Sequence, residues 1–258
     1  SFQLQRLLLG LTPWLAAPVH PGERTVWMTF LPRLSSDANG EPMDLLSAAD
    51  VVVLSSALLA WWERHGRGGI PWKLLPGGER PAPDQELDPY SIWIAEVMLQ
   101  QTQLAVVLPY WERWMAVFPS VEALAAATLD EVRLQWQGLG YYSRARRLHE
   151  AAQLLVSGPW PRTLESWMAL PGIGRTTAGS ILSSAINAPL PILDGNVKRV
   201  LARLTAHPRS PARDDALFWR WSEALLDPVR PRDTNQALMD LGATLCTPRQ
   251  PDCHRCPW

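Results

Sequence analysis

A glutamate stands in the middle of the apolar run "WIAEVMLQQTQ", residues 93–103. The run is typical of a helix, and the residues before it suit a helix start, because Asp88 can cap and Pro89 fits the first helical position. Burying an ionised carboxylate is costly unless it is paired or takes up a proton. Glu96 is therefore either a solvated surface residue or a poised acid.

A second carboxylate stands in "PILDGNVKRVL", residues 191–201. Asp194 is an excellent N-cap for the helix predicted after it, and this role alone explains a lone Asp. It is followed closely by Asn196, Lys198 and Arg199, a polar and basic setting in which a carboxylate could also face a DNA groove. The residues alone leave both interpretations open.

Between these carboxylates lies "LPGIGRTTAG", residues 170–179, which predicts two helices joined by a tight Pro-Gly-Ile-Gly turn. Glycines permit backbone conformations closed to other residues and allow a ligand to approach closely. The second helix would begin with exposed N–H groups and the positive end of its dipole, which suits a phosphate. Nothing in the motif reads a base, so it would position DNA rather than select a sequence. A plain helical hairpin is the alternative.

The three cysteines lie in the last 13 residues, spaced Cys246-x6-Cys253-x2-Cys256. Such crowding indicates metal ligation more than a disulfide framework. Thiolates suit an iron–sulfur cluster or zinc, and both usually take four ligands. His254 follows Cys253 directly, an awkward geometry for binding the same ion, so we expect a fourth cysteine beyond Trp258.

The charge of the chain is distributed unevenly. The formal net charge is −1, which by itself argues against nucleic acid. Residues 138–203, however, carry 8 basic and only 3 acidic side chains, the kind of local excess that attracts phosphates, although a solvated helix face would also explain it. Lysines are scarce, because Lys73 and Lys198 are the only two.

Helical signals follow one another from residue 54 onward, with no strand pattern. Ser120 is predicted to cap a short helix, the "TLDE" at 128–131 has the capping-box pattern, and Ser210-Pro211 is predicted to open a late helix. Further helices are predicted within 54–67, 104–118, 141–158, 163–170, 175–187 and 195–204.

These elements predict an all-α fold of two helical lobes, carrying a helix–hairpin–helix motif and a cluster-binding loop. Residues 1–53 would form a loop-rich N-terminal extension, in which 23–31 could be one strand, and residues 54–258 the catalytic domain. The 258 residues, 47% of them hydrophobic, suffice for a substantial core. No run approaches the ~18 apolar residues of a membrane span, and we expect no targeting peptide.

Six motifs occur in order: "EVMLQQTQ", "GLGYYSRARRL", "LPGIGRTTAG", "ILDGNVKRVLARL", "MDLGATLCTPRQPDC" and "CPW". Together they closely resemble the adenine DNA glycosylases (the MutY family) of the helix–hairpin–helix, endonuclease III superfamily. The resemblance covers roughly residues 54–258. It implies a monofunctional base-excision-repair enzyme that hydrolyses the N-glycosidic bond of adenine mispaired with 8-oxoguanine or guanine.

The resemblance also assigns roles to the two carboxylates. It makes Glu96 the general acid and Asp194 its electrostatic partner, with Asn196 in the same catalytic set. The chemistry agrees, because a Glu on an apolar helix face can hold a proton and deliver it to the leaving base. An ionised Asp194 would stabilise the cation-like sugar while water adds, so two carboxylates in different surroundings would take different roles.

The target base must leave the stack before it is cut, so the enzyme is expected to flip it. By resemblance, Gln101 and Tyr141 fill or wedge the opened duplex; for Tyr141, simple packing beside Tyr142 is the alternative. The partner implied is double-stranded DNA containing A·8-oxoguanine or A·G mispairs. The remaining DNA-binding residues expected are Pro171, Gly172, Ile173, Gly174, Arg175, Thr176 and Lys198.

The resemblance further implies that Cys246, Cys253 and Cys256 hold a [4Fe–4S] cluster. We expect a monomer that is not attached to a membrane and not secreted. Its compartment would be the cytoplasm with the bacterial nucleoid, or the nucleus or an organelle in a eukaryote.

The sequence departs from the family pattern in three places. A fourth cluster cysteine is absent from the sequence, the loop after "IPW" carries extra residues, "LLPGGERPAPDQEL", and the usual C-terminal domain that helps to sense 8-oxoguanine is missing. Recognition of the damaged partner base is therefore the least secure of the implied properties.

Three rival functions remain. An endonuclease III-like lyase needs an amine nucleophile, usually a Lys just after the hairpin, and here that position is Thr176. A G·T-mismatch glycosylase is not excluded by Thr176. A helix–hairpin–helix module that binds DNA without activity is opposed only by the pairing of Glu96 with Asp194.

Overall fold

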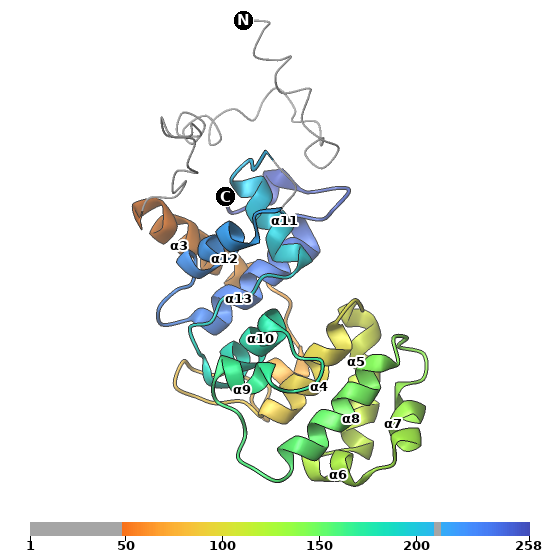
Figure 1. Cartoon of the computed structure of the whole chain (residues 1–258). Helices are drawn as coiled ribbons and strands as arrows, with labels where there is room; N and C mark the ends of the chain where they lie inside the picture. Colours follow the sequence, from red (N-terminus) through yellow and green to blue (C-terminus); the bar gives the residue numbers. More distant parts are fainter. Residues whose placement is uncertain (1–47, 209–212) are drawn as a thin grey trace, which may run out of the picture. The chain divides into compact units, whose positions relative to one another are not determined.

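The computed structural model describes residues 48–208 and 213–258, and every regular element in these ranges is helical (Figure 1). The all-α prediction is therefore confirmed for this part of the chain. The strand expected within 23–31 and the helix opening at Ser210-Pro211 lie outside the described residues. The elements are α3 (Ala48–His65), η2 (Pro71–Lys73), α4 (Pro89–Leu99), α5 (Leu104–Val117), α6 (Val121–Ala126), α7 (Leu129–Trp136), α8 (Ser143–Leu155), α9 (Leu164–Met168), α10 (Arg175–Ile186), α11 (Gly195–Leu204), α12 (Asp215–Ala224), α13 (Pro231–Asp240), η4 (Leu241–Leu245) and η5 (Cys253–Arg255).

The described residues divide into two compact units, named here by their central helices. The α4 unit comprises residues 67–192 and 228–235. The α11 unit comprises residues 48–66, 193–208, 213–227 and 236–258. Each unit therefore draws on segments that are far apart in the sequence.

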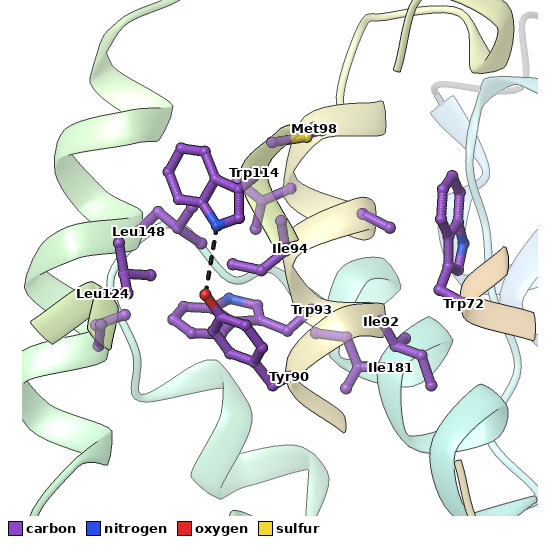
Figure 2. Close-up of a cluster of buried hydrophobic side chains, with 14 of the residues drawn as sticks. Trp72, Tyr90, Ile92, Trp93, Ile94, Met98, Trp114, Leu124, Leu148 and Ile181 are labelled. Atoms are coloured by element: carbon purple, nitrogen blue, oxygen red, sulfur yellow. Dashed lines mark hydrogen bonds between the residues drawn. The ribbon is translucent and has the colours of Figure 1, made fainter. Parts of the chain in front are cut away.

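Helix α4 forms the core of its unit and packs against α5, α8 and α10. Apolar side chains cover nearly its whole surface, as expected of a helix enclosed by others. Figure 2 shows Trp93 and Ile94 of α4 in a cluster that Leu148 joins from one side and Ile181 from the other. Trp114 of α5 closes this cluster and donates a hydrogen bond from Nε1 to the Tyr90 hydroxyl at 3.4 Å.

The helix starts follow the predicted capping residues. The Asp88 side chain accepts hydrogen bonds from the backbone N–H groups of Tyr90 and Ser91 at the start of α4, and Ser120 caps α6. Thr128 and Glu131 form the predicted capping box at α7. These caps satisfy N–H groups that have no partner within the helix, so they fix where each helix begins.

Helix α3 begins at Ala48, six residues before the predicted start at Leu54. The sequence "AADVVV" obscured this start, because three consecutive valines are stiff at χ1 and read more readily as a strand. Val52 and Val53 are exposed in the structure. The helix itself, and its end before Gly66, are as predicted.

In the α11 unit, helix α11 packs against α12 and against the π-helix η4. Two tryptophans tie separate segments of this unit together. The Nε1 of Trp62 in α3 donates to Oδ2 of the buried Asp240 at 2.9 Å, and the Nε1 of Trp258 donates to the Leu54 carbonyl at 2.9 Å. None of the described helices is long and apolar enough to cross a membrane.

Candidate active site and DNA-binding elements

Glu96 lies on α4 with only 11% of its side chain exposed. Its Oε1 is 3.4 Å from the Nζ of Lys73, whose side chain is 14% exposed. The sequence left two interpretations of Glu96 open, a solvated surface residue and a poised acid. The low exposure of the side chain shows that the first interpretation is wrong. The carboxylate is largely buried and is paired with an ammonium group, the condition under which burial of a charge becomes tolerable.

Lys73 is held from a second side by helix α10. Its Nζ also donates a hydrogen bond to the hydroxyl of Ser184, which is buried on that helix. Lys73 ends the short 3-10 helix η2, and the neighbouring Trp72 is buried against Trp111. The sequence contained no signal for this triad, because its three members are distant in the chain and Lys73 precedes a Gly- and Pro-rich loop.

Asp194 caps α11, as predicted, and both of its carboxylate oxygens accept hydrogen bonds. Oδ1 accepts from the backbone N–H of Val197 at 2.8 Å, and Oδ2 accepts from Nδ2 of Asn196 at 3.0 Å. The carboxylate is thereby fixed in one orientation. The capping role and a role in chemistry are compatible, since the side chain is only partly buried.

Arg199 extends this arrangement toward the cysteine segment. Its Nη2 donates to Oδ1 of Asn196 at 2.9 Å and to the Gly242 carbonyl at 2.7 Å, and its Nε donates to the Cys246 carbonyl at 2.9 Å. Burial lowers the pKa of Arg199, although the Cys246 thiol and Asp194 oppose that shift. In the sequence Arg199 appears only as part of a basic patch. Its partners Gly242 and Cys246 lie 43 and 47 positions later in the chain, so no local pattern indicates these contacts.

Gly242 stands where η4 passes closest to Asn196. A Cβ at this position would lie 2.7 Å from the Cβ of Asn196, closer than side chains pack. The glycine in "DLGATL" is therefore required by the approach of two backbones. It allows η4 to lie directly against the residue that holds Asp194.

The helix–hairpin–helix motif has the predicted form, with α9 and α10 joined by residues 169–174. Gly172 adopts a φ of +83°, and a Cβ there would come within 3.2 Å of the Arg147 side chain. Gly174 is the N-cap of α10 and offers no side-chain cap. Ile173 is buried under the turn, while Gly172, Gly174 and Arg175 are exposed. The turn thus presents backbone at the positive end of α10, where an anion is favoured.

Gln101 and Tyr141 share an unusual backbone conformation. Gln101, just after α4, has a φ of +59°, and Tyr141, just before α8, has a φ of +47°. Both side chains are exposed, Tyr141 by 62%. The neighbouring Tyr142 is exposed as well, by 46%. Side chains of this kind are uncommon in the left-handed region, and such strain gathers at functional sites.

Lys198, predicted to bind DNA, is paired within its own unit. Its Nζ donates to Oδ1 of Asp215 on α12 at 2.7 Å. The pair is partly exposed, so a phosphate would compete with Asp215 for this ammonium group.

The three cysteines form no disulfide; Cys246 follows η4, Cys253 begins η5 and Cys256 follows it. Arg203 holds the first of them, donating from Nη1 to the Cys246 Sγ at 3.4 Å and to the Thr247 carbonyl at 2.7 Å. Burial raises the pKa of Cys256 to about 11. Thiols of this density suit iron–sulfur clusters or zinc. Nevertheless, within residues 48–208 and 213–258 no three Cys, His, Asp or Glu side chains converge as a ligand set.

The predicted residues are thus distributed over both units. The α4 unit contains Glu96, Gln101, Tyr141 and the whole hairpin motif, and the α11 unit contains Asp194, Asn196, Lys198 and the cysteines. Each unit therefore contains one of the two carboxylates.

The comparison with protein families gives one match that spans half of the chain. Residues 94–223 match the family described as "HhH-GPD superfamily base excision DNA repair protein". The matched range begins within α4, two residues before Glu96, and ends within α12. It includes both carboxylates and the hairpin.

Several curated proteins are similar to most of the chain. The adenine DNA glycosylase of Mus musculus is 44% identical over 227 residues, which cover 85% of this chain and 43% of that protein. The Homo sapiens protein of the same name is 44% identical over 217 residues, covering 81% of this chain and 39% of that protein. The Arabidopsis thaliana protein is 39% identical, covering 84% and 38%. The chain thus spans about two-fifths of the length of these relatives.

Solved structures agree on the fold. A thermostable thymine-DNA glycosylase superimposes with a TM-score of 0.69 at 26% identity, covering 81% of this chain and 94% of that one. An endonuclease III–DNA covalent intermediate superimposes with a TM-score of 0.63 at 23% identity, covering 82% and 93%. At that identity the second likeness concerns the fold alone.

Proposed function

Because the chain belongs to the HhH-GPD superfamily of base excision DNA repair proteins, we propose that it hydrolyses the N-glycosidic bond of adenine mispaired with 8-oxoguanine or guanine. The observation that carries the proposal is Glu96, a largely buried carboxyl group on a largely apolar helix, within the matched range. The choice of adenine is supported by the names of the curated relatives.

In the proposed reaction, Glu96 delivers a proton to a ring nitrogen of the extruded adenine. Protonation turns the base into a good leaving group, and general acids of this kind contribute roughly 10²–10⁴-fold. Lys73 is hydrogen-bonded to Oε1 of Glu96. The water that adds to the sugar gives up a proton, and this proton would restore the acid form of Glu96, while the Lys73 side chain holds the carboxyl group in place.

Asp194 would act on the sugar rather than on the base. As the bond breaks, positive charge develops on the sugar ring, and a fixed carboxylate stabilises it without having to reorient. The hydrogen bonds from Val197 and Asn196 give Asp194 that fixed orientation. Asn196 therefore contributes by holding the carboxylate.

The DNA backbone would be bound at the hairpin, through the N–H groups of Gly174, Arg175 and Thr176 at the start of α10. We further propose that Gln101 and Tyr141 occupy the space left in the duplex when the adenine is extruded. Their exposed side chains and left-handed backbone support this role. The ammonium group of Lys198 would leave its ion pair with Asp215 and bind a phosphate group of the DNA instead.

We also propose that Cys246, Cys253 and Cys256 hold a [4Fe–4S] cluster together with a fourth ligand from outside this set. The donor chemistry and the spacing support it, and the role would be structural. Where the fourth ligand is also supplied, iron and sulfide should approach four each per chain in protein purified without oxygen, whereas the three thiolates alone should bind the cluster weakly. About one zinc and no iron would contradict it.

The function is tested by excision assays on matched duplexes. Oligonucleotides carrying A·8-oxoguanine, A·G and A·T pairs would be incubated with the enzyme in excess, and abasic sites would be cleaved with alkali. We expect excision from the first two and not from A·T. A duplex with a G·T mismatch is the necessary fourth arm, because a thymine-DNA glycosylase shares this fold at 26% identity. Release of thymine without release of adenine would contradict the proposal.

A further inference from the structure

Gln101 and Tyr141 lie on two separate loops that meet at one buried arginine. Gln101 follows the end of α4, and Tyr141 follows the "GLG" turn after α7. In both loops the left-handed conformation must be held by surrounding contacts, since side chains disfavour it. Arg144, near the start of α8, lies between the loops and is only 7% exposed.

Arg144 binds the end of α4 through one nitrogen of its guanidinium group. Nη1 donates to the carbonyls of Val97 at 3.2 Å and Met98 at 2.8 Å, and also to that of Gln100. Carbonyls in the last turn of a helix have no partner within the helix, and a positive charge there is favourable to the helix dipole. The arginine thus caps the C-terminal end of α4, which is Leu99, two residues before Gln101.

The other terminal nitrogen binds the second loop. Nη2 donates to the carbonyls of Leu139 at 3.0 Å and Gly140 at 3.3 Å, the two residues before Tyr141. It also donates to the hydroxyl of Thr102 at 3.3 Å, directly after Gln101. One rigid, planar group therefore binds the chain on both sides of Gln101 and directly before Tyr141.

The guanidinium group also lies over two aromatic rings, that of Trp136 at the end of α7 and that of Tyr141 in the second loop. Its central carbon lies 5.2 Å from the ring centroid of Trp136 and 5.5 Å from that of Tyr141. The Trp136 Nε1 in turn donates to the Gly140 carbonyl at 3.0 Å. Of the six acceptors of Arg144, five are carbonyls and one is a hydroxyl. The charge is therefore used to order backbone rather than to pair with a carboxylate.

We propose that Arg144 is a positioning residue that holds Gln101 and Tyr141 together as a preformed wedge for extruding the target base. This inference rests on the proposed function, because it concerns how adenine leaves the duplex before Glu96 acts. The cation links both loops within one unit, so the two side chains keep a fixed spacing. A wedge set in advance loses little freedom when it enters the duplex.

The test separates base extrusion from bond cleavage. Single-turnover excision would be measured for Arg144→Met and Arg144→Lys on an A·G duplex, and on a duplex in which the adenine faces an abasic-site analogue. An unpaired base is easier to extrude. We expect Arg144→Met to cut A·G about 10- to 100-fold more slowly, the range typical of a displacement of about 1 Å, and to approach the parent rate on the unpaired adenine.

A second readout does not depend on chemistry. With 2-aminopurine beside the target adenine, binding of the parent should raise the fluorescence as stacking is lost, and Arg144→Met should give a smaller rise. Arg144→Lys keeps the charge but not the planar guanidinium group, so its fluorescence rise should lie between those of the parent and of Arg144→Met. It also replaces the Met variant in the test if that variant does not fold.

Arg113→Met is the matched control. Arg113 also donates to one backbone carbonyl, that of Gln135 at 3.1 Å, and lies over the ring of Tyr110 at 4.5 Å. Neither of these contacts involves Gln101 or Tyr141, so this variant should match the parent on both duplexes.

The outcomes are distinct. An equal loss on both duplexes, or no loss on either, would overturn the positioning role. If the parent releases no adenine from any duplex, the proposed function fails, while the fluorescence comparison still decides the role of Arg144. If the fluorescence rises with the parent enzyme but not with Arg144→Met, the result supports the preformed wedge. Equal rises in fluorescence for the two proteins would refute it.

Discussion

The buried pair of Lys73 and Glu96 gives the sharpest prediction on stability. Replacing Lys73 by Met keeps an unbranched side chain of similar length but leaves the Glu96 carboxylate without the ammonium group 3.4 Å away. Removing one partner of a fully buried pair costs about 3–5 kcal/mol. These side chains retain 14% and 11% exposure, so water screens part of the charge, and we expect a loss of about 1–3 kcal/mol in the free energy of unfolding.

The assay is urea unfolding of Lys73→Met, Glu96→Gln and the double variant. The double variant has no unpaired charge at this position, so its loss should be smaller than the sum of the single losses by about 1–2 kcal/mol. The slope against urea should be unchanged, since the area exposed on unfolding is the same. Arg162→Met breaks the exposed pair with Glu86 and should leave the midpoint unchanged. Additive single losses would refute the argument that the two charges depend on each other.

Three further predictions concern single positions. Burial raises the pKa of Tyr90 above its ordinary 10.0, so the folded state keeps the phenol proton and stability should fall as the pH rises above 10; a Tyr90→Phe variant should lose that extra slope in unfolding experiments. A Gly242→Ala change places a Cβ 2.7 Å from that of Asn196 and should cost roughly 1–3 kcal/mol and slow excision, whereas Gly68→Ala, in open space, should do neither. With Thr176 where a lyase would carry its amine, the product should be an intact abasic site, and efficient trapping by borohydride would contradict this.

The parts of the fold that were predicted correctly depend on neighbours in sequence. The caps at Asp88, Ser120, Thr128 and Asp194 need only the residue and the next three positions. The hairpin turn was predicted for the same reason, since its glycines serve a local backbone geometry. The start of α3 was misplaced because the local signal of its valines favours a strand.

The parts that were missed depend on contacts between distant residues. Lys73 and Glu96 are 23 positions apart, with a loop between them whose path no periodicity predicts. Arg199 reaches Cys246 across 47 positions, and Arg144 reaches Val97 across a similar separation. In the sequence these arginines look like members of a basic patch. Their actual partners are backbone carbonyls, which carry no signal in the side-chain pattern.

The measurement that tests the central claim most directly is single-turnover excision of adenine by Glu96→Gln. The amide keeps the shape of the side chain and can still contact Lys73, but it has no acidic proton to give. We predict a loss of about 10²–10⁴-fold in the rate on an A·8-oxoguanine duplex, with duplex affinity within about threefold of the parent at the same salt concentration. A variant that cuts within tenfold of the parent would contradict the assignment of Glu96 as the acid, and with it the proposed mechanism.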